Sequence, residues 1–445
     1  MLNSILVRRK AVLYAIVMLA VSAAAIKSES ASQGSGMPKD PGVRSGPPAA
    51  GQPIAGLSAG ELYYFNNDGQ KTFAEVDGVA EGLGPRFNLD SCAGCHAYPA
   101  LGGSSPATNP QVAQAATMAP GNRVPAFLSL NGPIREVRFV RNPDGTPDGG
   151  VHGIFTISGR PDAPAGCAIT QPDFSNTANM AFRIPTPIFG AGLIESIPDS
   201  TIRRNLAANA TAYPTLNPGH LNTNGNDGTV TRFGWKAQNK SLAIFAAEAY
   251  NVEQGVTNEL FPNEREGDQS CATNGTPESD LGFQVGVTNP SDVVVFRAFM
   301  RFLDAPAPAC VGNACSPSIQ NGHFLFERVG CTGCHTEVLH TGVSATAALS
   351  QKEVHLFSDL AVHNMGTGLA DGITQGSAGP SEFRTAPLWG LGQRIFFLHD
   401  GRTTDLLQAI LAHQSQGSDA SGVTTMFRLQ SPSDQQDILN FLRSL

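Results

Sequence analysis

Two short segments of the sequence carry two cysteines and a histidine at the same spacing, Cys92-Ala93-Gly94-Cys95-His96 and Cys331-Thr332-Gly333-Cys334-His335. This spacing is the signature of covalent c-type haem attachment, in which the two thiols bond the porphyrin and the adjacent histidine coordinates the iron. We therefore expect two covalently bound haem c groups, with Cys92, Cys95, Cys331 and Cys334 as attachment residues and His96 and His335 as axial ligands. The alternative, a thioredoxin-like pair or a zinc knuckle beside a histidine, would have to occur twice in one chain.

The first residues have the pattern of an export signal. Arg8, Arg9 and Lys10 precede an apolar run that ends in small residues near position 26, which predicts a signal peptide over residues 1–26 and an exported, periplasmic bacterial protein. The run is short for a membrane span of about 20 apolar residues, so no stable span is expected after cleavage, although an uncleaved anchor is the alternative. Residues 27–56 are rich in Ser, Gly and Pro and predict a flexible linker, with folded structure from about Leu57.

Composition narrows the fold and the partners. The 445-residue chain has 37 acidic and 29 basic residues, a net charge of −8, and no Lys/Arg cluster outside the leader, which argues against a nucleic-acid partner. Glycine (48) and proline (31) are abundant, which favours a mainly α fold with extensive irregular loops. The length allows two domains, expected at 57–300, an N-terminal haem domain with long insertions, and at 301–445, a C-terminal cytochrome-c-like haem domain.

The cysteines outside the two motifs are Cys167, Cys271, Cys310 and Cys315. Disulfides are the default for an even number of cysteines in an oxidising compartment. Cys310 and Cys315 are close enough to close a tight loop, and Cys167 with Cys271 would then be the long-range link. A redox-active role for Cys310 and Cys315 is the alternative, although their spacing is not C-x-x-C.

A degenerate repeat follows each haem motif. Phe182-Arg183-Ile184-Pro185 continues to Gly192 in the first half, and Phe383-Arg384-Thr385-Ala386-Pro387 continues to Gly392 in the second. A helix is expected after each repeat, with Asn239 or Ser241 as one N-cap and Thr404 or Asp405 as the other. Two related haem domains are the simplest account of this order.

The two motifs, with GLGPRFNLDSCAGCHAYPALGGSSP at the start and FRTAPLWGLGQRIFFLHDGRTTDLLQAILAH at the end, resemble the di-haem oxidoreductases sometimes called thiol oxidoreductases. These are similar in plan to bacterial di-haem cytochrome c peroxidases and to the methylamine-utilisation di-haem enzymes. The resemblance covers nearly all of residues 57–445. It implies two cytochrome-c-like haem domains packed around a shared interface, and a bridging Ca²⁺, for which no acidic loop of ligand spacing stands out here.

The resemblance also implies the second ligand of the C-terminal haem iron. The residue that binds this iron in the peroxidases corresponds to His413, and a His–His pair suits electron transfer rather than substrate binding. A helix-terminal histidine with no ligand role is the alternative reading of His413. Met365 is the second candidate ligand, and otherwise fills an apolar gap.

At the first haem, the resemblance exposes a departure from the peroxidase pattern. The Gln and Glu that flank the distal pocket in those enzymes are replaced here by Phe233 and Ala243. Cleavage of peroxide needs a positioned proton carrier. Glu248, on the same expected helix as Ala243, and Glu195, after the first repeat, are the candidates, and a surface or structural carboxylate is the alternative for each.

Further residues are expected near the haems. His152 lies in a glycine-rich segment that suits a mobile distal ligand of the first haem, although an exposed turn histidine is the alternative. Trp235 is expected between the haems or packed against one porphyrin, and Lys236 beside it is expected to bind a propionate. The haem-contact candidates are Trp235, Lys236, Arg384 and Trp389.

These observations predict an exported di-haem c-type oxidoreductase of peroxidase type. The C-terminal haem would pass electrons from a small redox protein to the N-terminal haem, which meets peroxide or another small substrate. The competing hypothesis is an electron-transfer cytochrome with both haems six-coordinate. A protein-modifying oxidase like the methylamine enzymes is disfavoured, because those have a tyrosine where His413 stands.

Overall fold

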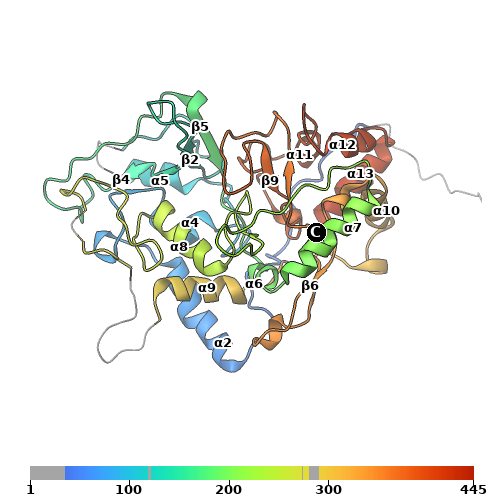
Figure 1. The fold of residues 1–445 in the computed structure, drawn as a ribbon, viewed down its shortest axis with the longest axis horizontal. Coiled ribbons are helices and arrows are strands. Elements are labelled where there is room, and N and C mark those ends of the chain that lie inside the picture. The colour runs from blue at the N-terminus through green and yellow to red at the C-terminus, as the bar shows by residue number, and fades with distance from the viewer. Residues whose placement is uncertain (1–35, 119–121, 273, 280–289) are drawn as a thin grey trace, which may run out of the picture. The chain divides into compact units, whose positions relative to one another are not determined.

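The computed structural model describes residues 36–118, 122–272, 274–279 and 290–445. The expected signal peptide over residues 1–26 lies outside the described residues. Pro38–Leu445 forms one compact unit (Figure 1). No helix in the described part of the chain has the length and apolar character needed to cross a membrane.

The fold of this unit is mainly α with long irregular connections, as expected. The α-helices are α2 (Ala59–Tyr64), α3 (Gln70–Ala74), α4 (Cys92–Cys95), α5 (Pro110–Thr117), α6 (Ala191–Glu195), α7 (Asp199–Ala212), α8 (Leu242–Glu253), α9 (Asp292–Phe302), α10 (Pro317–Arg328), α11 (Leu406–Leu411), α12 (Ser421–Arg428) and α13 (Pro432–Ser444). Short 3₁₀ or π turns are η1 (Phe65–Gly69), η2 (Val79–Glu81), η3 (Thr177–Asn179), η4 (Gly312–Ala314), η5 (Cys331–Gly333), η6 (Ala347–Leu349) and η7 (Leu391–Gln393).

The strands are short and antiparallel. They are β1 (Arg86–Phe87), β2 (Glu136–Phe139), β3 (Val151–His152), β4 (Phe155–Thr156), β5 (Met180–Arg183), β6 (Leu339–His340), β7 (Glu353–Val354), β8 (Val362–Asn364) and β9 (Glu382–Arg384). The largest sheet has the order β3-β2-β5, with Glu136 opposite Arg183. This sheet therefore delivers polar residues of β2 and β5 to one place in the first half.

Helix packing forms the two main cores. In the first half α8 lies beside α9 (Figure 1), and their buried residues include Leu242, Tyr250 and Phe299. In the second half α10 crosses α13 at Gly322, where a Cβ would lie 1.9 Å from a backbone oxygen of α13. Ser241 caps α8 and Asp405 caps α11, which confirms these N-caps, because each side chain accepts a backbone N–H of the first turn.

The segment before Leu57 is not a flexible linker from Pro38 onward, so the prediction for residues 27–56 is wrong there. Asp40 forms an ion pair with the buried Arg443, 2.6 Å between Oδ2 and Nη2. This segment and residues 302–307 are joined by backbone hydrogen bonds from N–H groups to carbonyl oxygens. One of them runs from the N–H of Ile54 to the carbonyl of Phe302, at 2.8 Å. Composition suggested disorder, but the segment's backbone groups are paired with partners far along the chain.

The sequence repeat has a structural counterpart. β5 ends at Arg183 and β9 ends at Arg384, and each strand leads into a proline-containing segment. Each segment ends at a glycine in the left-handed region, Gly190 (φ 66°) before α6 and Gly390 (φ 73°) before η7. A side chain at Gly190 would also meet Trp389 at 2.6 Å. The same local path is thus built twice, as the repeat predicts.

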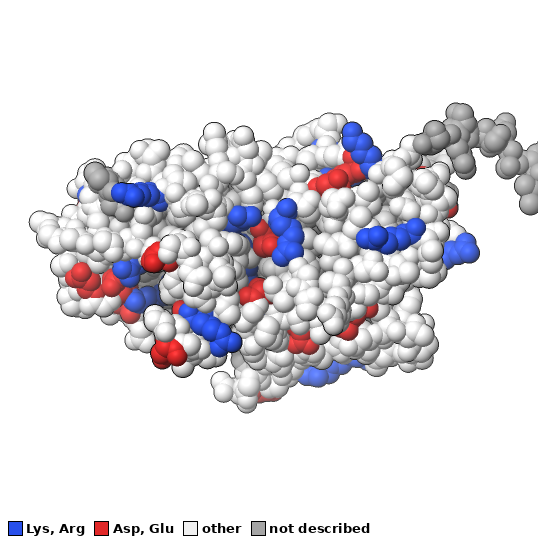
Figure 2. All heavy atoms as spheres, turned by 90° about the horizontal axis from the view of Figure 1, so that it is seen from above, with Lys and Arg blue, Asp and Glu red and all other residues white. Residues whose placement is uncertain are grey.

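Two disulfides are present, Cys167–Cys271 and Cys310–Cys315. The division into haem domains at 300/301 stays a prediction, since α7 of the first half contacts the second haem motif. Asn209 of α7 donates to the carbonyl of Gly333 at 3.1 Å, and Tyr213 bonds Thr332 at 2.6 Å. On the face seen in Figure 2, basic and acidic side chains are scattered among uncharged ones, without a continuous basic patch.

Candidate functional site

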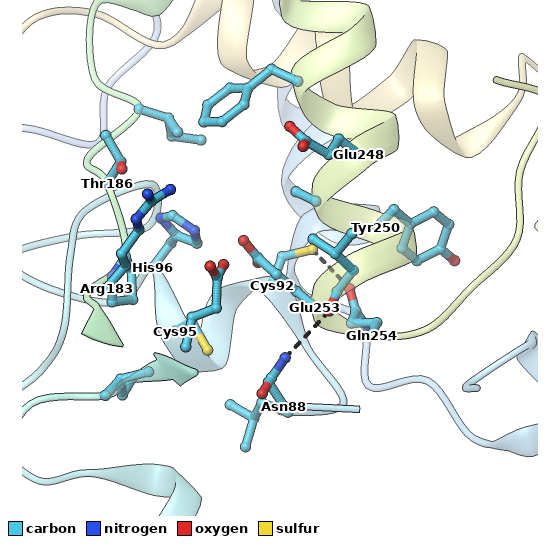
Figure 3. Close-up of a pocket in the computed structure, with 18 of the residues that line it drawn as sticks. Asn88, Cys92, Cys95, His96, Arg183, Thr186, Glu248, Tyr250, Glu253 and Gln254 are labelled. Atoms are coloured by element: carbon cyan, nitrogen blue, oxygen red, sulfur yellow. Dashed lines mark hydrogen bonds between the residues drawn. The ribbon is translucent and has the colours of Figure 1, made fainter. Parts of the chain in front are cut away.

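The first haem motif opens onto a cavity of about 1140 Å³, the N-terminal cavity (Figure 3). The residues of this motif that line it are Cys92, Cys95 and His96, and α8 and the β2–β5 sheet supply much of the remaining wall. Nδ1 of His96 lies 3.0 Å from the carbonyl oxygen of Gly103. As the N–H donor of that bond, Nδ1 fixes the ring and leaves Nε2 as the atom available to a metal. Burial lowers the pKa of His96 to about 4, so the ring is neutral, as a metal ligand must be.

Two carboxylates from α8 project into this cavity, Glu248 and Glu253, facing the side that holds His96 and Arg183 (Figure 3). Glu248 accepts a hydrogen bond from the side-chain amide of Asn239. Burial, reinforced by the negative charges of Glu136 and Glu248, raises the pKa of Glu253 to about 8. The site therefore contains three glutamates: Glu248 hydrogen-bonded to Asn239, Glu136 paired with Arg138 at 2.7 Å, and Glu253, which keeps its proton near neutral pH.

Sequence reasoning missed Glu253. Its signal is the helical spacing of Phe245, Glu248 and Val252, which places one face of α8 on the cavity and brings the adjacent Glu253 to the same wall. The buried position of Glu253 depends also on the sheet that carries Glu136, which no local pattern reveals.

Two predicted residues lie elsewhere, and the roles expected for them at the first haem are wrong. Glu195 accepts the backbone N–H of Leu242 at 3.0 Å and forms an ion pair with Arg301, so it fixes the start of α8 and does not line the cavity. His152 stacks on Phe139 and points Nε2 at Asp148, 2.9 Å away. Its side chain is on β3, outside the cavity wall.

The second motif opens onto a larger cavity of about 1450 Å³, the C-terminal cavity. Cys331, Cys334 and His335 line it, together with His413 and Met365. Nδ1 of His335 lies 3.0 Å from the carbonyl of Phe357, and Nδ1 of His413 lies 2.8 Å from the carbonyl of Ala409. Both rings are therefore held at Nδ1 as His96 is, and no hydrogen bond to either Nε2 is found among the described residues.

Four other histidines have the opposite arrangement, in which Nε2 and not Nδ1 makes the close contact. Each places Nε2 against a carboxylate, at 3.1 Å or less: His152, His220, His323 and His363. His363 also lies near Cys334, and with Asp359 these form a group of three possible metal ligands among the described residues. The Cys334 sulfur belongs to the second haem motif, so this group is part of the C-terminal site.

A middle cavity of about 800 Å³ shares lining residues with each of the other two. Trp235 lines all three cavities and donates its ring N–H to the carbonyl of Ile184 at 3.0 Å. Arg384 and Trp389 also line the middle cavity, and their role as haem contacts stays a prediction. Lys236 does not, and the expected propionate contact is wrong: its fully buried amine donates to the carbonyls of Gly379 and Glu382 and pairs with Asp371.

The family model described as "Di-haem oxidoreductase, putative peroxidase" matches residues 143–445, more than half of the chain. The chain belongs to the di-haem oxidoreductase family. The match includes the second haem motif, α8 and His413, whereas the first motif precedes it. Membership implies haem cofactors for this di-haem oxidoreductase. No curated protein matches the sequence.

Three solved structures are remote neighbours of this di-haem oxidoreductase. Hydrazine synthase from Kuenenia stuttgartiensis shares 12% identity over 91% of this chain and 97% of that chain, with a TM-score of 0.34. The diheme peroxidase BthA from Burkholderia thailandensis shares 14% over 74% and 94%, with a TM-score of 0.30. A MauG-like protein associated with microbial copper homeostasis shares 19% over 35% and 52%, with a TM-score of 0.25. Likenesses this distant carry no argument about function.

The residues of this di-haem oxidoreductase fit haem groups. Each motif lies on the wall of a cavity that is lined mainly by apolar surface, which suits a porphyrin. In each, a carbonyl-anchored histidine stands beside two unpaired cysteines. The buried Nη2 of Arg394, on the wall of the C-terminal cavity, has no hydrogen-bond partner and suits an anionic group.

Proposed function

We propose that this di-haem oxidoreductase is an exported c-type cytochrome of peroxidase type. Cys92 and Cys95 would attach one haem and Cys331 and Cys334 the other. Electrons would pass from the C-terminal to the N-terminal site, where peroxide or another small oxidant reacts. The observation that carries this proposal is the difference between the two cavities in the described part of the chain. The C-terminal cavity is lined by His413 and two further histidines besides His335, whereas the N-terminal cavity is lined by His96 and three glutamates, Glu136, Glu248 and Glu253.

At the C-terminal site, His335 and His413 would be the two side chains that hold the haem iron. The two rings line one cavity, and each is held by a backbone carbonyl at Nδ1. Met365 lines the same cavity and is the second candidate for the His413 position. A site closed by two protein ligands favours electron transfer over substrate binding.

At the N-terminal site, His96 is the only histidine among the described residues that line the cavity. When bound there, haem would supply the iron that exchanges electrons with the oxidant. Glu253 holds a proton at neutral pH and can donate it to a substrate oxygen, and Glu248 can accept one while Asn239 keeps its carboxylate in place. These two residues would take over the acid–base task left open by Phe233 and Ala243.

Trp235 is the candidate path between the sites, because it lines all three cavities. A small redox protein remains the expected electron donor. The Ca²⁺ implied by the resemblance stays a prediction. The described residues include no group of acidic ligands that would hold it.

Low-temperature electron paramagnetic resonance of the purified ferric protein, repeated after half-reduction, tests this proposal. A high-spin signal, at rest or on half-reduction, is expected from the N-terminal site. Peroxide turnover should fall at least tenfold in Glu253→Gln, while Lys240→Met, at the surface, should match the wild type. Two low-spin signals in every redox state would instead identify an electron-transfer cytochrome without a substrate site.

A further inference from the structure

Two arginines belong to the walls of both the middle cavity and the C-terminal cavity. Arg384 and Arg394 line both cavities together with Trp235. Arg384 donates its Nε–H to the carbonyl of Gly234 at 3.0 Å, and Arg394 donates its Nε–H to the carbonyl of Phe396 at 3.1 Å. The guanidinium of Arg394 also lies over the Trp235 ring, 5.8 Å from its centroid. One edge of each guanidinium is thus fixed by the protein, and the other donors are left for a further group.

Neither arginine has a counter-charge. Within the described residues, no carboxylate contributes to the electrostatic surroundings of Arg384 or Arg394. Burial lowers the pKa of each guanidinium to about 10, and the positive charge of Arg394 adds to the effect on Arg384. The Nη2 group of Arg394 is buried without a hydrogen-bond acceptor. Two unpaired cations held close together in a buried site are unfavourable unless anions join them.

Elsewhere the chain supplies such partners itself. Among the described residues, the other buried arginines each have an acidic partner: the pairs are Arg138–Glu136, Arg183–Asp371, Arg232–Asp199 and Arg443–Asp40. The absence of a carboxylate at Arg384 and Arg394 is therefore a property of this place in the fold. A guanidinium pairs well with a carboxylate because both groups are planar and two parallel hydrogen bonds can form.

We propose that Arg384 and Arg394 form the site that receives the two propionate carboxylates of the haem held by His335, and that their positive charge raises the reduction potential of that haem. This inference rests on the proposed function, because it requires a haem at the second motif. Reduction adds an electron to the haem, and nearby cations stabilise the reduced form. The arginine pair would thus oppose the lowering of potential that two histidine ligands bring, and keep this haem reducible by a modest donor.

The test is a spectroelectrochemical titration of the haem-loaded protein. Arg394→Met and Arg384→Met remove one charge each, Arg394→Lys keeps it, and Arg428→Met removes a charge from the exposed end of α12. We expect each buried Met variant to lower the reduction equilibrium constant of the low-spin haem at least tenfold, which is about 59 mV for a one-electron couple. Arg394→Lys and Arg428→Met should stay close to the wild type, and the high-spin haem should shift less than the low-spin haem.

Unchanged potentials in both buried Met variants would overturn the inference. Arg394→Met could also lose the C-terminal haem. In that case, retention of the haem in Arg394→Lys would support binding of a haem carboxylate by this residue, and equal loss of haem in both variants would overturn the inference. Succinate added to the wild type should leave the potential unchanged, because a shift would mean that the site is open to free dicarboxylates. Haem content and spin states of the wild type test the proposed function separately, so the two failures are distinguishable.

Discussion

A buried ion cluster next to Trp235 should be a main support of the fold. Asp371 accepts from Nη2 of Arg183 at 2.8 Å and lies 3.1 Å from Nζ of Lys236, and the three side chains are 1%, 4% and 0% exposed. Arg183 lines the N-terminal cavity, while Asp371 lies in the second half of the chain. The cluster therefore ties the wall of the first site to the second repeat.

The perturbation is Asp371→Asn, which keeps the shape and removes the charge. Breaking a buried ion pair typically costs about 3–5 kcal/mol, because the remaining charge is left uncompensated. Lys236 should reduce the free-energy cost of removing the Asp371 charge. Its pKa is already lowered to about 8 by burial, so it can shed its proton when Asp371 is neutral. We therefore expect the free energy of unfolding to fall by about 3 kcal/mol at neutral pH.

The defect should depend on pH. A lysine whose folded pKa lies below its unfolded value of 10.5 destabilises the protein fully below the folded pKa, and the penalty fades as pH rises towards 10.5. Loss of Asp371 lowers the folded pKa of Lys236 further, so this window should open at lower pH than in the wild type. The variant should thus lose less stability at pH 9 than at pH 6.

Guanidinium denaturation of the haem-loaded protein, followed by far-ultraviolet circular dichroism, measures the effect. Asp227→Asn is the matched control, because Asp227 pairs with Lys240 at the surface and should leave the midpoint nearly unchanged. Combining Asp371→Asn with Lys236→Met should recover part of the loss, since only Arg183 then remains unpaired. A wild-type midpoint for Asp371→Asn, or a defect that is the same at both pH values, would refute the reasoning.

Three further perturbations test separate parts of the molecule. His413→Ala should turn the low-spin C-terminal haem high-spin in the absorption spectrum, whereas Met365→Ala should not; an unchanged spectrum for His413→Ala would rule out that ligand. The pKa of Glu253, raised from 4.5 to about 8, implies stability that is present below pH 4.5 and lost as pH rises through 8, and Glu253→Gln should remove this slope from the denaturation curves. Cys167→Ser opens a disulfide that spans 104 residues and should cost about 4 kcal/mol, with a correspondingly lower melting temperature; the disulfide that closes the short loop should contribute much less.

The parts of the site that the sequence could predict are those in contiguous patterns. The spacing of Cys92, Cys95 and His96 fixes which residues share one turn of chain, so their common cavity follows from local structure. The N-caps Ser241 and Asp405 were predictable for the same reason, because a cap acts on backbone groups two or three residues away.

The parts that failed depend on where a side chain turns and on partners distant in sequence. Lys236 follows Trp235 directly, yet it turns from the cavities towards carbonyls more than 140 residues away, at sequence separations of 143 and 146. The sequence around Asp40 is typical of a flexible segment. Its ion pair with Arg443, which is 403 residues further along the chain, cannot be predicted from local sequence. Glu195 was expected at the iron but serves Arg301 and the start of α8.

The two repeats also explain why duplicated halves can perform different tasks. Arg183 and Arg384 stand at the same point of the repeat, each at the end of a strand and at the wall of a motif cavity. Arg183 is neutralised by Asp371, whereas Arg384 faces Arg394 without a carboxylate. In the first half the repeated arginine has a carboxylate partner within the protein, and the N-terminal cavity contains the protonated Glu253, which would favour proton-coupled chemistry in the proposed function. In the second half the repeated arginine lines the C-terminal cavity together with His413, which would favour electron transfer in the proposed function. In the proposed function, the different partner at one repeated arginine would be one of the features that distinguish the electron-transfer site from the substrate site.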